Sequence, residues 1–198
     1  MSELSHRQKS ILEAATRVIA RRGVRGLRVE ELSAEAGVST ALLYYHFGDR
    51  ANLLRRTLEF ISDRADRYTG EGVSADADPC AALERTLLLE LQDDPDVREN
   101  STAWGELRAS AVFEPELQDQ LRTSTEQWVR DIAELVERTR ACSATPAASH
   151  PADTAERLTA LVEGLSERWL SGSITLERAR HLLRDAIAAE VGETLHTG

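Results

Sequence analysis

Cysteine is nearly absent from the sequence, with only Cys80 and Cys142 among 198 residues. A disulfide framework needs more cysteines, so we expect two free thiols in a reducing cytoplasm. No cluster of cysteine and histidine has metal-ligand spacing, and no metal site is expected. No window of about 18 residues is apolar enough for a transmembrane helix, and the polar N-terminus lacks the pattern of a signal peptide. These absences predict a cytoplasmic protein that does not associate with membranes.

Catalytic motifs are lacking as well. The five histidines are scattered along the chain, and none has a paired carboxylate at a useful spacing. The sequence contains no glycine-rich phosphate loop, nucleophile elbow or metalloprotease helix. We therefore expect neither an enzyme nor a bound cofactor. A helical enzyme without a recognisable catalytic motif stays open as an alternative.

Positive charge is scarce overall, since the net charge is −10, but it is unevenly distributed. Residues 1–60 carry a net charge of +3, and residues 61–198 carry a net charge of −13. A basic end on an acidic body can present one face to DNA and repel DNA elsewhere. An architectural DNA-binding protein is a further alternative, although such a protein needs no large acidic body.

The sequence shows helical periodicity along most of its length. Apolar residues recur three and four positions apart along most of the chain, which predicts an all-α protein. Ser5 and Gln8 have the spacing of a capping box at the start of a first helix, and Gly23 is expected to end it. The arginines near the end of this helix suit either phosphate contacts or a solvated helix end; they are Arg17, Arg21, Arg22 and Arg25.

The segment Arg28–Phe47 predicts two short helices joined by a tight turn. Gly37 stands where a helix commonly ends in a left-handed residue, and Ser39 stands where the next helix needs an N-cap. Leu43 and Phe47 are four residues apart and are expected to point into the core. Helix, short turn and helix together form a helix-turn-helix, whose second helix suits the major groove of DNA.

From about Ser5 to Ala65 the sequence resembles the DNA-binding domain of the TetR family of transcriptional regulators. The resemblance rests on AGVS, then LYYHF, then an acidic–basic pair and a Leu-Leu pair within residues 35–54. It implies a helix-turn-helix domain at residues 5–65, with its motif at 28–47, and a helical effector-binding and dimerisation domain at 66–198. It further implies a homodimeric repressor on a palindromic double-stranded DNA operator. A small-molecule effector would move the connector helix and change the spacing of the two recognition helices from roughly 34–36 Å, one turn of DNA.

The resemblance gives candidate DNA-binding residues. They are Arg28, Ser39, Thr40, Ala41, Leu42, Tyr44, Tyr45, His46 and Arg50. The family usually has two threonines where Leu27 and Arg28 stand, and glycine where Ala41 stands, so the cap and the fit against the bases differ. The resemblance assigns a phosphate contact to Arg50. The helix dipole disfavours a cation at that position by roughly 0.3–1 kcal/mol, so another group should hold it; the alternative is an ordinary surface arginine.

The second domain is expected to consist of helices over residues 81–91, 97–112, 117–139, 155–170 and 176–191, with loops over 70–79 and 140–151. Large side chains in its middle helices predict an effector pocket between helices. The candidate pocket residues are Phe60, Trp104, Glu106, Arg108, Phe113 and Trp128. The alternative is that these aromatic residues belong to the core.

The last two helices resemble the pair through which members of the family dimerise. Gly164 lies inside the first of these helices at a propensity cost of about 1 kcal/mol, which a close helix approach would justify. The candidate interface residues are Leu158, Leu161, Gly164, Leu165, Leu176, Ala179, Leu183 and Ala186. The alternative is that the two helices only cover the body of their own chain.

Overall fold

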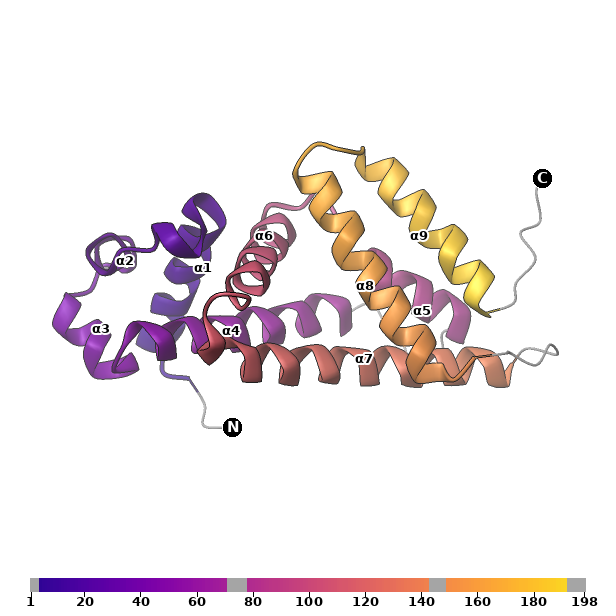
Figure 1. Ribbon diagram of the computed structural model, residues 1–198, viewed down its shortest axis with the longest axis horizontal. Coiled ribbons are helices and arrows are strands. Elements are labelled where there is room, and N and C mark those ends of the chain that lie inside the picture. Colours follow the sequence, from indigo (N-terminus) through magenta and orange to yellow (C-terminus); the bar gives the residue numbers. More distant parts are fainter. Residues whose placement is uncertain (1–3, 71–77, 143–148, 192–198) are drawn as a thin grey trace. The chain divides into compact units, whose positions relative to one another are not determined.

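The computed structural model describes residues 4–70, 78–142 and 149–191. Every regular element in these ranges is a helix, which confirms the predicted all-α fold. The helices are α1 (His6–Gly26), α2 (Val29–Ala36), α3 (Thr40–Phe47), α4 (Arg50–Gly70), α5 (Pro79–Leu88), α6 (Pro95–Ser110), the short η1 (Pro115–Leu117), α7 (Gln118–Ala141), α8 (Pro151–Leu170) and α9 (Leu176–Val191) (Figure 1). None of the described helices is long and apolar enough to cross a membrane.

The helix bounds agree with the sequence predictions to within about a turn. Two helices begin earlier than expected, α5 at Pro79 and α8 at Pro151, because the fixed φ of proline suits the first helical turn. Asp78 and His150 precede these prolines and accept backbone N–H groups as N-caps. Most of the two predicted loops, at 71–77 and 143–148, lies outside the described residues.

The chain forms two compact units that are not contiguous in sequence. Unit 1 comprises Met1–Arg64 and Glu99–Ser124, and unit 2 comprises Ala65–Arg98 and Thr125–Gly198. The helices α4, α6 and α7 each contribute residues to both units. The division expected from the sequence placed residues 99–124 in the effector domain, whereas in the structure they group with the DNA-binding motif.

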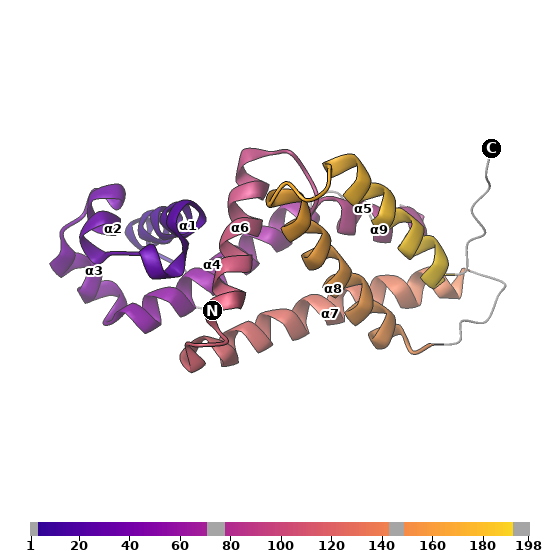
Figure 2. The same ribbon diagram turned by 45° about the horizontal axis from the view of Figure 1, so that its top comes forward.

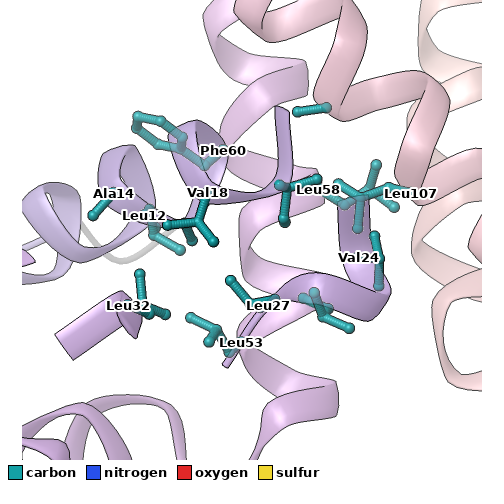
Figure 3. Packing of buried hydrophobic residues seen from close by; sticks show 14 of the residues in the cluster. Leu12, Ala14, Val18, Val24, Leu27, Leu32, Leu53, Leu58, Phe60 and Leu107 are labelled. Carbon is teal, nitrogen blue, oxygen red and sulfur yellow. The ribbon is translucent and has the colours of Figure 1, made fainter. Parts of the chain in front are cut away.

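The reason lies in the core of unit 1. Ala103 and Leu107 of α6, and Ala111 directly after it, are buried in one apolar cluster with α1 and α4. Figure 3 shows Leu107 close to Leu58 and Val24 in this cluster. A buried polar contact adds to it, because the side-chain amide of Asn100 donates to the carbonyl of Ile61 at 3.1 Å. Most of α6 is thus a structural part of unit 1.

The helix α1 is interrupted near its end. Gly23 has a φ of 71° and a ψ of 168°, which breaks the regular helix there, and a last turn continues to Gly26. The sequence predicted the end of the helix at Gly23, and this part of the prediction is correct. The capping box is also confirmed, since Ser5 Oγ accepts from the N–H of Gln8 at 3.2 Å and Gln8 Oε1 accepts from the N–H of Ser5 at 3.0 Å.

Unit 2 is built on α8 and α9, which lie side by side in both views (Figures 1 and 2). Its core contains Leu83 and Leu87 of α5, Ile132 and Val136 of α7, and the inner faces of α8 and α9. Arg180 of α9 donates to the carbonyls of Leu88 and Leu91 at 3.4 and 2.7 Å. This arginine satisfies carbonyls at the C-terminal end of α5 and ties α5 to α9.

Candidate nucleic-acid interface

The turn between α2 and α3 is formed as the sequence predicts. Gly37 is left-handed, with a φ of 64° and a ψ of 36°, and no atom of the chain would contact a side chain there. Ser39 is extended, and its Oγ accepts from the N–H of Leu42 at 3.2 Å. The left-handed Gly37 and the capping Ser39 let α3 begin after a turn of three residues.

The helix α3 has one buried face and one open face. Leu43 and Phe47 are 1% and 2% exposed and anchor the helix in the core of unit 1. Tyr44 and Tyr45, in contrast, are 44% and 81% exposed. Exposed aromatic side chains next to each other form a patch, and exposed patches often mark a binding surface. The open face is therefore the candidate contact surface for the major groove.

The other DNA-binding candidates surround this open face. Arg28, Ser39 and Ala41 are exposed, and Thr40, Leu42, His46 and Arg50 are half-buried. Thr40 Oγ1 lies 3.3 Å from Ser33 Oγ, and Arg28 makes no side-chain cap for α2, as the missing hydroxyl at its position predicts. These placements are compatible with DNA contacts, and the roles of the individual residues stay predictions.

The arginines of α1 contact carboxylates of α2. Arg17 and Arg21 reach Glu35 at 2.9 and 2.6 Å, and Arg22 reaches Glu31 at 2.8 Å. Hydrogen bonds from Arg21 and then Arg17 hold the pKa of Glu35 below its usual range. These three cations are thus paired with carboxylates within unit 1.

Arg50 is held by two acceptors of its own chain. Its Nη1 donates to Glu114 Oε2 at 3.1 Å, and its Nη2 donates to the carbonyl of Val24 at 2.8 Å. The side chains of Arg50 and Glu114 are 38% and 23% exposed. The group needed to hold a cation at the first residue of α4 is therefore present within the chain.

Glu106 also binds the interruption of α1. Its Oε2 accepts from the N–H of Val24 at 3.4 Å. A Cβ at position 23 would lie 2.6 Å from the same oxygen, so the carboxylate would have to shift, and the positive φ of 71° favours glycine there. Val24 thus receives one contact from α6 on its N–H and one from α4 on its carbonyl.

The six predicted effector residues divide between the two units, and their role in effector binding stays a prediction. Phe60 is 4% exposed in the core of unit 1, and Trp128 belongs to unit 2. Trp104 packs against the core of unit 1 with the guanidinium of Arg108 5.5 Å from its ring centre. Glu106 and Phe113 line an open pocket of about 600 Å³ in unit 1, and Phe113 is 72% exposed. Helical periodicity in the sequence identified large side chains, but it did not identify the residues that lie next to them in the structure.

The sequence analysis missed a polar group in unit 2. Tyr68 Oη donates to Glu90 Oε2 at 2.7 Å. Burial raises the pKa of Glu90 to about 7 despite the hydrogen bond from Tyr68, and the charges of Asp66 and Glu163 raise it further. Two hydroxyls of unit 2, Thr86 Oγ1 on α5 and Ser166 Oγ on α8, are buried without a partner among the described residues. In the sequence, Tyr68 near the end of α4 was the one residue that could have indicated this polar group.

An aromatic–cation pair also lies in unit 2. The guanidinium of Arg98 is 4.9 Å from the centre of the Trp169 ring, which is 8% exposed. Trp169 lies on α8, six residues after Glu163. The face of this ring therefore already accommodates a cation from within the chain.

The predicted dimer residues divide into two sets. Leu158, Leu165, Ala179 and Leu183 are at most 3% exposed and form part of the core of their own unit. The other four are half-buried, namely Leu161, Gly164, Leu176 and Ala186. A Cβ at Gly164 would meet no atom of the described residues within 4 Å. The close approach that the sequence predicts at this glycine is therefore not made by the part of the chain that the structure describes.

Comparison with known proteins gives the family context. Residues 79–192 match the family described as BetI-type transcriptional repressor, C-terminal, and residues 11–57 match the bacterial regulatory proteins of the tetR family. The chain is 26% identical to the HTH-type transcriptional regulator BetI of Rhizobium meliloti over 93% of its own length and 89% of that protein.

Two solved structures are also similar. A protein described as a TetR-family transcriptional regulator from Rhodococcus sp. is 47% identical, with a TM-score of 0.88, over 95% of this chain and all of that one. A transcriptional regulator from Saccharomonospora viridis in complex with choline is 26% identical, with a TM-score of 0.80, over 91% of this chain and 94% of that one.

The cap of α3 provides a test of the interface geometry. Ser39→Ala should lower the free energy of unfolding by about 1 kcal/mol, because the N–H of Leu42 loses its acceptor. Ser39→Asp keeps an acceptor and should retain nearly wild-type stability. Urea denaturation followed by circular dichroism measures both variants. Equal stability of Ser39→Ala and the wild type would contradict the structural role of this cap.

Proposed function

Because the chain belongs to the TetR family of transcriptional regulators, we propose that it is a repressor that binds a palindromic operator as a homodimer and is released by a small molecule. The two matching families are families of regulators, which does not favour the alternative of a helical enzyme. The observation that carries the DNA-binding part is the open face of α3, with Tyr45 81% exposed beside a buried anchor of Leu43 and Phe47.

Contacts with DNA are proposed residue by residue. Thr40, Leu42 and Tyr45 face the base edges, since they lie on the first turns and open side of the recognition helix. Tyr44, Arg28 and Arg50 contact phosphates at its borders, together with the hydroxyl of Ser39. Ala41 allows close approach to a base, and His46 lies at the end of the helix.

The effector is proposed to be a small organic cation of the choline type. The regulator from Saccharomonospora viridis was crystallised with choline, and unit 2 of this chain offers chemistry that suits a cation. The Glu90 carboxylate lies in the field of Asp66 and Glu163 next to the aromatic ring of Tyr68. Carboxylates and aromatic faces both attract quaternary ammonium groups.

The unpartnered hydroxyls support the same choice of ligand. Ser166 lies three residues after Glu163 and shares a face of α8 with it, whereas Thr86 lies on α5 and Glu90 follows two residues after the end of that helix. A buried hydroxyl without a partner is costly, and a ligand that carries one hydroxyl, as choline does, can satisfy it. The effector site is therefore proposed around Tyr68, Glu90 and Glu163.

The dimer is proposed to form through the outer faces of α8 and α9. Leu161, Gly164 and Ala186 lie on these faces. The fully buried residues of the predicted set are left out of the proposed interface, and Ala160, Leu182 and Ala189 are added to it. Small residues at the centre of such a face let two helices approach closely, as in four-helix bundles.

Recognition by α3 can be tested after an operator has been selected from random duplexes. Leu42→Ala or Thr40→Ala should change the relative affinity for operators with single base changes by about 1–3 kcal/mol. Arg28→Ala should instead weaken all sequences together, because a phosphate contact carries no sequence information. Fluorescence anisotropy at fixed salt measures both effects. An unchanged base preference in Leu42→Ala and Thr40→Ala would contradict the proposed reading face.

Dimerisation can be tested at Gly164, where the chain itself leaves open space. Gly164→Leu should fold normally but yield monomers, because the added side chain blocks the second copy. Gly70→Leu is the matched control, since a Cβ at that glycine also meets no atom within 4 Å. Light scattering at micromolar concentration distinguishes the two. A dimeric Gly164→Leu, or a monomeric wild type, would overturn the proposed interface.

Effector binding should depend on pH through Glu90. Its folded-state pKa of about 7 exceeds the ordinary value of 4.5, so the unfolded state binds fewer protons between these values and stability falls as pH rises through this window. The ionised carboxylate attracts a cation, so choline should bind roughly tenfold tighter at about pH 8 than at about pH 6. Isothermal titration calorimetry with choline measures this dependence.

Two variants distinguish an effect of Glu90 itself on choline binding from a general effect of losing one negative charge. Glu90→Gln should weaken choline binding and abolish its pH dependence. Glu167→Gln removes the same charge from an exposed position of α8 and should leave both unchanged. If the protein binds DNA but neither choline nor other quaternary ammonium compounds, the effector class is wrong and the DNA-binding proposal stands.

A further inference from the structure

Arg50 lies at the border of the proposed DNA-contacting face. It is the first residue of α4 and follows the end of α3 by three positions. A helix in the major groove is flanked by the two phosphate backbones, so a cation beside its end is placed to meet a phosphate. Arg17, Arg21 and Arg22 are paired to carboxylates of α2, whereas the carboxylate partner of Arg50 comes from the segment after α6.

The guanidinium of Arg50 is nevertheless engaged inside unit 1. It donates to a carboxylate oxygen of Glu114 at 3.1 Å and to the carbonyl of Val24 at 2.8 Å. A carboxylate and a phosphate offer the same kind of acceptor to a guanidinium, an anionic oxygen in the plane of its N–H groups. The two anions therefore compete for one cation.

Glu114 has no other structural duty that the described contacts reveal. It stands at the N-cap position of η1, yet its side chain makes no capping hydrogen bond there. Its carboxylate instead reaches 64 residues back along the chain to Arg50. The adjacent Phe113 and Val112 are each 72% exposed; the segment is held by the buried Ala111 and Leu117, by the guanidinium of Arg25 5.4 Å from the Phe113 ring centre, and by a hydrogen bond from Gln118 to the carbonyl of Ala111.

We propose that Glu114 acts as an internal competitor of DNA for Arg50. Binding of DNA exchanges the Glu114 carboxylate for a phosphate oxygen, while the contact with the carbonyl of Val24 can persist. The exchange lowers affinity for every DNA sequence alike. It also links the segment between α6 and α7 to the state of the DNA-contacting face. This inference rests on the proposed DNA-binding function.

The size of the effect follows from the exposure of the pair. An ion pair between half-exposed side chains is weak, which corresponds to about a two- to fivefold change in an equilibrium constant. Glu114→Gln keeps the shape of the side chain and removes its charge. It should therefore tighten DNA binding by about two- to fivefold for each half-site occupied, and more at low salt than at high salt.

The experiment uses a fluorescein-labelled duplex of arbitrary sequence, because a phosphate contact requires no operator. Anisotropy titrations at several salt concentrations compare the wild type, Glu114→Gln and Glu116→Gln. Glu116 is exposed on the same segment and loses the same charge, so it reports any long-range electrostatic effect. Glu114→Gln should exceed this control clearly. Circular dichroism melting confirms that each variant is folded.

The decisive comparison is made in an Arg50→Ala background. There the Glu114→Gln change should have no more effect than Glu116→Gln, because the contested cation is gone. Equal effects of the two glutamate changes in the presence of Arg50, or an undiminished effect of Glu114→Gln without Arg50, would overturn the competition. A wild-type protein that binds no duplex at any salt concentration would instead overturn the proposed function, and the competition with it.

Discussion

The backbone of Val24 is the point on which unit 1 depends. Gly23 interrupts α1, and backbone groups beside such a break need partners; the carbonyl of Val24 accepts from the N–H of Leu27 at 3.2 Å within the same segment. Glu106 from α6 takes the N–H and Arg50 from α4 takes the carbonyl. One peptide segment therefore connects three helices that are far apart in sequence. The choice of glycine at position 23 follows from its positive φ and from the carboxylate packed against it.

Local features of unit 1 could be predicted because each depends on residues within a few positions of one another. The capping box at Ser5, the left-handed Gly37 and the N-cap at Ser39 all have this property. The dipole argument also showed correctly that Arg50 needs a partner. It could not identify Glu114, since no local pattern links two residues 64 positions apart. The resemblance pointed to DNA, and the structure adds an acceptor inside the chain.

The residues predicted for the effector site and the dimer interface show what helical periodicity cannot predict. A 3.6-residue period shows which side chains share a face, but not whether that face meets the same chain, a second copy or a ligand. Leu158 and Leu183 lie on such a face, and it is covered by their own unit. Likewise Trp104 and Trp128 are both large and apolar, yet they belong to different units. Glu90 escaped notice because its importance comes from burial, which a single carboxylate in a leucine-rich helix does not reveal.

The division of α4, α6 and α7 between the two units has a consequence for how such regulators can be recombined. A chain that passes between units three times has no single junction at which one half can be exchanged. A hybrid made by fusing residues 1–64 to the body of a relative would receive foreign residues in place of Ala103, Leu107 and Ala111, which complete the core of unit 1. Transplantation of a sensing region therefore requires either three matched junctions or the retention of residues 99–124. The same requirement would restrict natural recombination between relatives to partners whose α6 fits the recipient.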